Sequence, residues 1–442
     1  MTAVRPRVVV VGSGFGGLNA ALHLASAPVE IVVVDRDNYH GFWPLLYQVA
    51  TAGLGADDIA HPIRAIYGPH PNISVRLGTV TGVDLDARVV HLARCDGPSA
   101  GGGPGGPAAE PSLPYDFLIL AAGSATSDFG ISGVAEHAFP LKTLPDAVRL
   151  RNHVLSTFEA ADADPRGGGP GALTVVLVGG GSTGVEMAGA LSELIGRNLA
   201  ADFRHLDVAS ARVIVVEMAD HLLPGFGPTS QAAAYRTLTQ KGVQIRLSTR
   251  LAQVDAGGVT LEGGERIEAA TVVWTAGIQA SPLSAAIPGD KGKGGAIEVG
   301  PDLSLPGHPE VFVIGDLAAR RSRRGQPLPQ VAQVAIQGGK HAARTIRRRL
   351  GGRRSRPFRY HDHGTMATIG RRSAVAELPG GIALHGTVGW LAWLAVHLVF
   401  LVGFRNRAVV LVNWAYNYLT WDRATRVILD NGDHPATGQR RA

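Results

Sequence analysis

The stretch VVVVGSGFGGLNAALHLASAPVEIVVVD, residues 8–35, decides the fold. It opens with four valines, turns through GSGFGG, continues with the helix-forming LNAALHLAS and ends in a second apolar run that closes at Asp35. Runs of β-branched residues favour strands, and a glycine-rich turn between a strand and a helix is typical of a βαβ unit. The sequence therefore predicts an α/β protein with a parallel sheet.

The glycines of this turn have the spacing GxGxxG, which is typical of a dinucleotide-binding fold. Gly12 allows the tight turn, Gly14 lets the backbone approach a pyrophosphate, and Gly17 lets helix and strand pack closely. Asp35 stands 23 residues after Gly12, where a carboxylate holds a ribose hydroxyl. A glycine-rich turn without a ligand is the alternative, but the complete set of strand, helix and acid favours a cofactor site.

A second unit of the same kind follows, in which LTVVLVG leads into GGSTG and the apolar helical stretch VEMAGALSELI. Its glycines are Gly179, Gly181 and Gly184, and the strand RVIVVE ends at Glu217, 38 residues after the first of them. The longer spacing predicts an extended helix and a loop around residues 204–211. Because Glu217 accepts a hydrogen bond from a free 2′-hydroxyl and repels a 2′-phosphate, it favours NADH over NADPH. Two such units imply two nucleotide cofactors with electron transfer between them.

The composition of the 442 residues allows a large core, since 45% are hydrophobic, but it excludes dithiol redox chemistry. Cys95 is the one cysteine, so an intramolecular disulfide, a CxxC redox pair and a thiolate zinc site are all excluded. Redox chemistry must come from a cofactor, and no metal site is predicted. The Gly/Pro-rich residues 97–111 are interpreted as an insertion without chemistry, and residues 162–171 as a linker that places a boundary near residue 170.

Positive charge is concentrated in one part of the chain. The sequence holds 42 basic and 36 acidic residues, and 13 of the basic ones lie between Arg320 and Arg359, where no Asp or Glu occurs. Such a patch is an electrostatic footprint for phosphate, either of nucleic acid or of anionic lipid headgroups. For the run Arg347 to Arg349 with Arg353 and Arg354, a solvated surface helix is an equally good explanation.

The C-terminal part is apolar. Residues 378–404 are 27 residues without Asp, Glu, Lys or Arg, a length that could span a bilayer. His385, His397 and five glycines in the run argue against a span, whereas the crowded aromatic residues after position 408 favour an interfacial helix hairpin. A buried core helix is the remaining alternative. Residues 1–7 contain no signal peptide, so the protein is expected to begin in the cytoplasm.

Three further motifs follow the two glycine-rich turns in order: FLILAAGS (117–124), VVWTAG (272–277) and VFVIGD (311–316). With them the chain resembles the flavoproteins that have two dinucleotide-binding domains, the first for FAD and the second for NAD(P)H. The resemblance covers about residues 7–340 and implies that the last Asp contacts the ribityl chain. It adds as cofactor-binding candidates Ala122, Gly123, Ala276, Gly277, Gly315 and Asp316. Within the group, the lack of a Cys pair removes the disulfide reductases and, by resemblance, the sulfide:quinone reductases.

Three segments indicate a closer resemblance: DRDNYHGFWPLLYQVATAGL (35–54), AQVAIQ (332–337) and the apolar tail. These segments resemble type II NADH:quinone oxidoreductase, the respiratory enzyme that does not pump protons. Trp43 departs from the pattern, because the family more often carries Gln there. Gln333 and Gln337 are four residues apart and share one helix face. Their amides can donate to and accept from a quinone carbonyl that becomes a hydroxyl. The alternative is a polar helix face that bonds only to water. By resemblance, Glu186 lies near nicotinamide, flavin and quinone; a helix-dipole partner is its alternative role.

We therefore predict an α/β flavoenzyme with two Rossmann-like dinucleotide-binding domains, the second inserted in the first, and a C-terminal membrane-associating helical region. The predicted FAD domain is 1–125 with 300–378, the NADH domain 170–298, and the anchoring region 379–442. Glu186, Gln333 and Gln337 are the predicted catalytic residues. The expected partners are a membrane quinone, the bilayer surface at the cytoplasmic face of the cell membrane and a second copy in a homodimer, and no nucleic acid.

Two rival functions remain open at this point. A soluble NADH:ferredoxin or rubredoxin reductase of the same fold would use the basic patch to dock an acidic protein. A flavin-binding regulatory or nucleic-acid-binding protein would use the same patch to contact phosphate backbones. Neither rival requires the apolar tail.

Overall fold

The computed structural model describes residues 5–93, 112–164, 169, 171–322, 325–420, 423 and 425–429. Cys95, the predicted insertion 97–111 and part of the predicted linker 162–171 lie outside the described residues. The chain forms two compact units. Unit 1 comprises residues 1–41, 61–125 and 278–362, and unit 2 comprises residues 42–60, 126–277 and 363–442. The predicted cofactor domains, which have other bounds, stay a prediction.

Unit 1 is built on a six-stranded sheet whose central strand is the valine run at the start of the chain. The four valines are almost fully buried, as expected for a strand covered on both faces. In spatial order the strands are β21 (Ser304–Leu305), β22 (His308–Val313), β9 (Phe117–Leu120), β1 (Arg7–Val11), β2 (Glu30–Asp35) and β5 (Ile73–Leu77). All pairs are parallel except β21 with β22.

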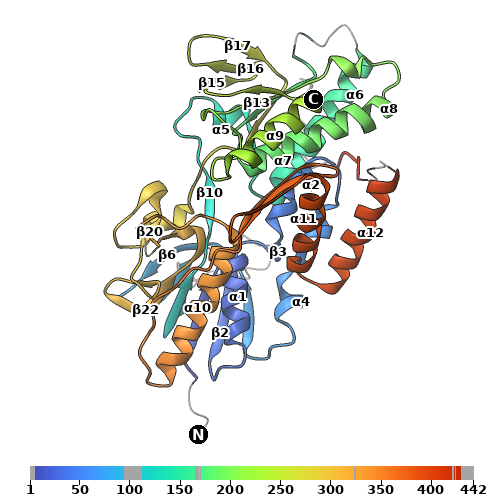
Figure 1. Ribbon diagram of the computed structural model, residues 1–442. Helices are drawn as coiled ribbons and strands as arrows, with labels where there is room; N and C mark the ends of the chain where they lie inside the picture. Colours follow the sequence, from blue (N-terminus) through green and yellow to red (C-terminus); the bar gives the residue numbers. More distant parts are fainter. Residues whose placement is uncertain are drawn as a thin grey trace, which may run out of the picture. The chain divides into compact units, whose positions relative to one another are not determined.

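Two helices of unit 1 lie side by side (Figure 1): α1 (Phe15–Leu24) and α10 (Ala332–Leu350). Glycines allow this close approach, since a Cβ on Gly339 would lie 2.2 Å from the carbonyl oxygen of Gly16. The unit also contains a three-stranded antiparallel sheet of β6 (Val80–Asp84), β7 (Val89–Leu92) and β8 (Ser112–Pro114). Shorter elements are β3 (Tyr39–Gly41), α4 (Ile63–Tyr67), β19 (Ile278–Ala280), β20 (Ile297–Glu298), the 3-10 helix η6 (Gly315–Leu317) and β23 (Ala318–Ala319).

Unit 2 repeats the architecture with a five-stranded parallel sheet. Its order is β11 (Phe139–Pro140), β18 (Thr271–Trp274), β12 (Thr174–Val178), β13 (Arg212–Val216) and β14 (Gln244–Arg246). The larger helices are α6 (Leu144–Ala163), α7 (Ser182–Glu193) and α9 (Pro228–Gln240). A separate antiparallel sheet holds β15 (Leu251–Asp255), β16 (Gly258–Leu261) and β17 (Arg266–Glu268) and closes a common core with the parallel strands.

The predicted extension between the second turn and its acid is confirmed. Helix α7 continues through a π-helical segment, η2 (Leu194–Leu199), and a last short turn, α8 (Ala200–Asp202), before the chain loops back to β13. The 38-residue spacing therefore leaves the βαβ geometry unchanged.

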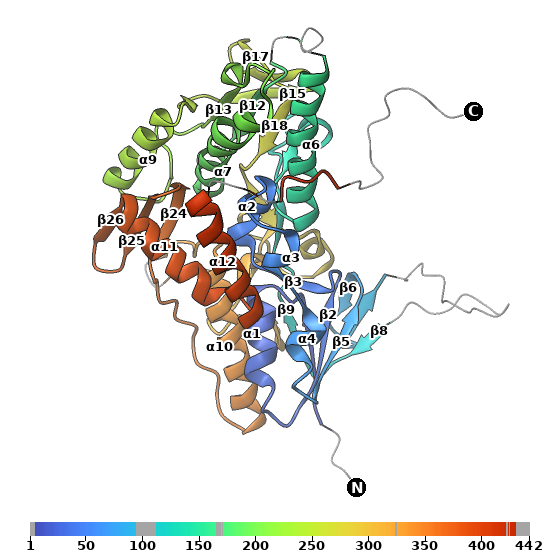
Figure 2. The same ribbon diagram turned by 90° about the vertical axis from the view of Figure 1, so that its right-hand side faces the viewer.

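The C-terminal part of unit 2 is an antiparallel sheet followed by a helix hairpin (Figure 2). The sheet consists of β24 (Thr365–Gly370), β25 (Ser373–Leu378) and β26 (Ile382–His385), and the hairpin of α11 (Gly386–Phe400) and α12 (Phe404–Thr420). The two short helices α2 (Leu46–Ala50) and α3 (Ala56–Ile59) belong to the same unit. The apolar run 378–404 is thus divided between strand and helix, and no helix in the described part of the chain is both long and apolar enough to cross a bilayer. The predicted fold class is confirmed.

Candidate active site

The first glycine-rich turn has the geometry that its spacing predicts. Gly12 has φ 94°, and a Cβ there would lie 2.5 Å from the carbonyl oxygen of Ala121. A Cβ on Gly17 would lie 1.8 Å from the carbonyl oxygen of Gly12, so only glycine lets α1 start this close to β1. Gly14 is different, because a Cβ there would meet nothing within 4 Å. The open space lies at the one glycine that the prediction assigns to the pyrophosphate.

The start of α1 and the end of β2 supply the polar groups of this turn. Gly14 is the N-cap of α1 and makes no side-chain cap bond, so the first amide groups of the helix can receive an anion. The Asp35 carboxylate accepts the N–H groups of Ser13 at 2.5 Å and of Asp37 at 2.9 Å. Burial raises the pKa of Asp35. Since a carboxylate has about four acceptor positions, two remain for ribose hydroxyls.

The second turn repeats these contacts. Gly179 has φ 111°, and a Cβ on Gly184 would lie 1.9 Å from the Gly179 carbonyl oxygen. Gly181, the N-cap of α7, has no side-chain cap bond and would give a Cβ open space. The Glu217 carboxylate accepts the N–H of Gly180 at 2.5 Å and that of Ala219 at 2.8 Å. Both glycine-rich turns therefore have the same backbone geometry, and their cofactor roles stay a prediction.

Two side chains next to the first turn were missed by the sequence analysis. The Nδ1 of His40 lies 2.8 Å from the carbonyl oxygen of Ser13, and the Tyr67 hydroxyl lies 2.9 Å from the Ser13 hydroxyl. The Nε2 of His40 is buried and has no hydrogen-bond partner among the described residues. Burial lowers the pKa of His40, so the neutral ring leaves Nε2 as an acceptor. A bound dinucleotide would satisfy this atom, and the residues around the first turn thus fit FAD.

The closing motifs lie at the ends of strands, as predicted. The Asp316 carboxylate accepts the hydroxyl of Ser124 at 2.6 Å, and Gly123 and Gly315 both have φ 68°. Ala122 precedes Gly123 at the end of β9. In unit 2, the backbone of Ala276 lies against Gly179, and Gly277 follows with φ 69°.

The two predicted quinone residues lie on α10 in unit 1. Gln337 donates from its amide to the carbonyl oxygen of His361 at 2.7 Å and accepts the His361 N–H at 2.9 Å. Gln333, one turn earlier, is half-buried. Between them, Ala335 lies beside Gly16 and Gly315. Because positions two apart lie on opposite sides of a helix, it is the face opposite the glutamines that borders the first turn, and the amide of Gln337 holds the backbone at His361.

Glu186 lies on α7 in unit 2 and is buried. Burial raises its pKa to about 8, and the N–H of Thr368, at 3.3 Å, opposes that rise. The indole of Trp393 also opposes it, although its buried N–H makes no hydrogen bond of ordinary geometry to any described residue. Glu186 therefore keeps its proton to a higher pH than an ordinary carboxyl. The helix-dipole alternative does not account for this burial.

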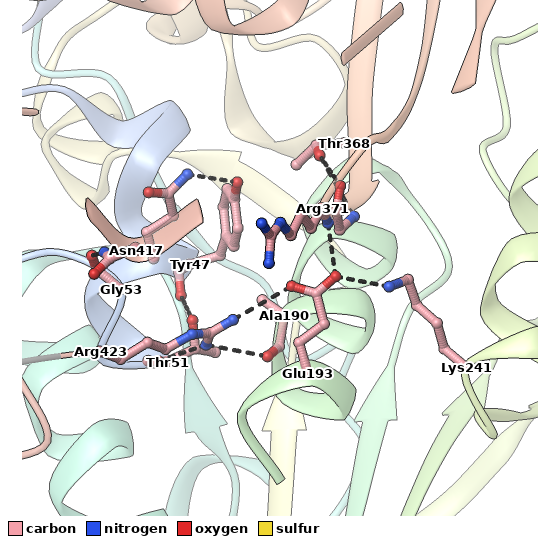
Figure 3. A network of polar contacts seen from close by, with 12 residues as sticks. Tyr47, Thr51, Gly53, Ala190, Glu193, Lys241, Thr368, Arg371, Asn417 and Arg423 are labelled. Carbon is pink, nitrogen blue, oxygen red and sulfur yellow. Dashed lines mark hydrogen bonds and ion pairs between the residues drawn. The ribbon is translucent and has the colours of Figure 1, made fainter. Parts of the chain in front are cut away.

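The surroundings of Glu186 come from parts of unit 2 that are far apart in the sequence. Trp393 of α11 is fully buried, stacks on His397 at 4.0 Å and lies 6.4 Å from the ring of Tyr47. The Tyr47 hydroxyl accepts the amide of Gln48, whose oxygen accepts the indole N–H of Trp414 from α12 at 2.8 Å. Figure 3 shows Tyr47 next to a second polar group centred on Glu193. None of these partners follows a spacing that sequence reasoning could have found.

The three predicted catalytic residues are thus divided between the units, with Gln333 and Gln337 in unit 1 and Glu186 in unit 2. In the described part of the chain, no group of three or more His, Cys, Asp or Glu could hold a metal ion.

Comparisons with known proteins agree with this geometry. The family model of pyridine nucleotide-disulphide oxidoreductases matches residues 6–339, and that of the NDH2 C-terminal domain matches residues 362–421. The type II NADH:quinone oxidoreductase Ndh of Mycobacterium tuberculosis is 40% identical over 96% of this chain and 91% of its own length. The chain belongs to the type II NADH:quinone oxidoreductases. A second member from M. tuberculosis, NdhA, is 42% identical over 94% of this chain and 87% of its own length.

The fold of this type II NADH:quinone oxidoreductase has a solved counterpart. NDH2 from Plasmodium falciparum, in complex with NADH, has a TM-score of 0.84, covers 96% of this chain and 100% of its own, and is 16% identical. At that identity the likeness shows the fold alone. The predicted family and enzyme class are confirmed by the M. tuberculosis relatives, and the ferredoxin-reductase and nucleic-acid rivals lose their support.

Proposed function

We propose that this chain oxidises NADH through bound FAD and reduces a membrane quinone without moving protons across the membrane. The observation that carries the proposal is the pair of matching glycine-rich turns, each with open space at its second glycine and a carboxylate bound to its backbone. FAD, when bound, supplies the redox chemistry, because it accepts a hydride and releases two electrons. The protein supplies binding, orientation and a proton.

The first turn binds FAD in this proposal. Gly12, Gly14 and Gly17 shape the backbone against the pyrophosphate, and Asp35 holds the ribose. His40 accepts a hydrogen bond through its unsatisfied Nε2. Further contacts come from Ala122, Gly123, Gly315 and Asp316. The FAD domain then comprises residues 1–125 and 300–378.

The second turn binds NADH, within residues 170–298. Gly179, Gly181 and Gly184 form the pyrophosphate site, closed by Ala276 and Gly277. Glu217 already accepts two backbone N–H groups, and its free acceptor positions suit a ribose 2′-hydroxyl. Because its carboxylate would repel a 2′-phosphate, NADH is the preferred donor.

Quinone reduction is assigned to Gln333, Gln337 and Glu186. A quinone that takes up two electrons must also take up two protons, and Glu186 is protonated below a pH of about 8. The glutamine amides can donate to a quinone oxygen and accept from the hydroxyl that it becomes. The contacts with His361 use one N–H and one oxygen lone pair of the Gln337 amide. Since the amide has two of each, the second N–H and the second lone pair can serve a quinone.

Replacing Gln337 by Leu tests this assignment. A lost hydrogen bond between neutral groups is worth about 0.5 to 1.5 kcal/mol, so quinone reduction should slow roughly tenfold while NADH reduces the flavin at its normal rate. The two half-reactions are measured separately by stopped-flow absorbance. Because the substitution also removes the contacts to His361, the thermal unfolding midpoint is the necessary control. Equal slowing of both half-reactions would assign Gln337 to general support of FAD.

Membrane attachment through α11 and α12 is supported by the surface of unit 2. Of nineteen strongly exposed large apolar side chains among the described residues, thirteen lie between Ile382 and Leu429. The inner face of α12 carries polar groups beside the buried Val410 and Trp414: Asn406, Asn413 and Asn417 all donate to the segment 53–60. A helix with polar groups inside and apolar groups outside suits a lipid surface. We assign the enzyme to the cytoplasmic face of the cell membrane; the homodimer stays a prediction.

Exposed apolar residues of α12 allow a test of this attachment without disturbing the core. Leu411 is 52% and Leu419 is 83% exposed. The double substitution Leu411→Glu with Leu419→Glu should move the protein from the membrane pellet to the supernatant, since charge on the apolar face opposes insertion. The matched control is Leu77→Glu, at an exposed position of unit 1. Continued sedimentation of the double variant with membranes in high salt would contradict the proposed face.

A further inference from the structure

An open pocket of about 280 Å³ lies on unit 2, outside the residues assigned to the cofactors and the quinone. It is lined by Glu193 at the end of α7, Lys241 after α9, and Arg371 and Arg372 in the turn between β24 and β25. Three of the four lining residues are cations. The pocket is therefore a concentrated positive site built from three separate elements of one unit.

The single carboxylate among the lining residues already accepts three hydrogen bonds (Figure 3). Glu193 accepts Lys241 Nζ at 2.7 Å and the backbone N–H of Arg371 at 2.6 Å, and its second oxygen lies 3.4 Å from a nitrogen of Arg423. Lys241 and Arg423 thus bind Glu193 through their side chains, and Arg371 and Arg372 add two further positive charges at the pocket. Burial, and next the charge of Arg372, lower the pKa of Arg371. An anion in the pocket would relieve this accumulation of positive charge.

The pocket also borders the apolar surface of α11 and α12. The Arg371 guanidinium lies 5.9 Å from the ring centre of Tyr418 on α12, and the hydroxyl of Thr387 on α11 lies 3.4 Å from the carbonyl oxygen of Arg372. Directly beside these contacts, Val388 is 62% and Leu419 is 83% exposed. A positive pocket thus adjoins the beginning of one apolar helix and the end of the other.

We propose that this pocket binds the phosphate of an anionic phospholipid whose acyl chains lie on the apolar face of α11 and α12. The proposal rests on the membrane attachment proposed above. Phosphate suits the site because guanidinium groups bind its oxygens in pairs, and a basic pocket beside an apolar surface matches the two chemical parts of a phospholipid. The headgroup phosphate of a lipid, rather than a free phosphate, explains why the pocket lies at this border.

Arg372 gives the cleanest test, because it is exposed and contacts α11 through its backbone carbonyl oxygen. The protein with its flavin is sedimented with vesicles of phosphatidylcholine alone and with vesicles that also contain phosphatidylglycerol. Phosphatidylglycerol should strengthen binding of the natural protein, and Arg372→Gln should reduce that increase about fivefold, as expected for one cation near a lipid surface. Arg372→Lys, which keeps the charge but loses the paired guanidinium donors, should retain only part of it.

The matched control is Arg236→Gln, which removes an exposed cation from α9 of the same unit but not from the pocket. Turnover of NADH with a water-soluble acceptor checks that every variant is folded. If Arg236→Gln lowers the phosphatidylglycerol effect as much as Arg372→Gln, general electrostatic attraction explains the effect and the pocket is not a binding site. Binding to vesicles of phosphatidylcholine alone measures attachment through the apolar face of α11 and α12. If the natural protein did not bind these vesicles, the proposed membrane attachment would be contradicted, independently of the pocket.

Discussion

The two glycine-rich turns of this enzyme have nearly the same backbone but different surroundings. In each, the first glycine has a positive φ and the third would place a Cβ less than 2 Å from the carbonyl oxygen of the first. In the first turn, Ser13 contacts Tyr67 and His40. In the second, Gly180 takes the place of Ser13, and a Cβ there would lie 2.6 Å from Leu222.

Under the proposed function, this difference separates a turn for FAD from a turn for NADH. The first turn is surrounded by polar side chains that can hold a dinucleotide firmly, as a resident flavin requires. In the second turn, Gly180 faces Leu222 and donates its N–H to Glu217, and no hydroxyl stands in the place of Ser13. Under the proposed function, this simpler turn receives NADH, a substrate that must leave after each turnover. The helices differ as well, because Asn19 of α1 bonds to the carbonyl oxygen of Phe15, whereas the equivalent Glu186 of α7 is a buried acid.

The largest effects should come from two single substitutions at matching positions of the turns, Gly17→Ala and Gly184→Ala. Each places a Cβ within 2 Å of a backbone oxygen, so each should destroy its own turn. Gly17→Ala should yield protein without flavin, whereas Gly184→Ala should retain flavin that NADH no longer reduces. Flavin absorbance after purification and after addition of NADH distinguishes the two. If both variants lost flavin equally, the two turns would not have separate cofactors.

Glu186→Gln tests the role of the buried acid that α7 has and α1 lacks. Because the folded protein raises the pKa of this carboxyl to about 8, the proton available to quinone is lost as pH rises through that value. Quinone reduction by the natural enzyme should therefore slow above about pH 8, and the variant should be slower by about a hundredfold, with a flat profile. Asn19→Asp, at the matching position of α1, should leave the profile unchanged. A bend near pH 8 that persists in Glu186→Gln would assign the proton to another group.

The same acid predicts a change in stability. Its pKa in the unfolded chain is near 4.5, so the folded state binds the proton more tightly, and the free energy of unfolding should decrease as pH rises from about 4.5 to about 8. Glu186→Gln should remove that decrease, as measured by denaturant unfolding at both ends of the range. An unchanged pH dependence would contradict the raised pKa.

Glu217→Gln should have the smallest effect. It keeps the shape but removes the charge that faces the ribose, and hydrogen bonds to charged groups are worth about 1.5 to 3 kcal/mol. The KM for NADH should rise about tenfold, and the ratio of kcat/KM for NADPH to that for NADH should increase, because repulsion of the 2′-phosphate is lost. Flavin content should remain normal. A constant ratio of the two donors would show that Glu217 does not contact the ribose.

The sequence predicted the two turns because their geometry is local. Glycine spacing and the acid after the next strand specify the backbone contacts of Asp35 and Glu217 without reference to the rest of the chain. The surroundings of Glu186 could not be predicted in this way, because Thr368 and Trp393 lie about two hundred residues away and reach it only through packing of unit 2. The sequence favoured an interfacial helix hairpin, but it did not show that the asparagines of α12 face inward to residues 53–60.

The central claim is that one turn holds the flavin and the other delivers NADH to it, with quinone as the acceptor. Double-mixing stopped-flow absorbance on the purified protein, without oxygen, tests it most directly. One equivalent of NADH should bleach the flavin, NADPH should do so more slowly, and a quinone added in the second mix should restore the oxidised spectrum at a rate that accounts for turnover. Flavin that NADH bleaches but quinone fails to reoxidise would contradict the account.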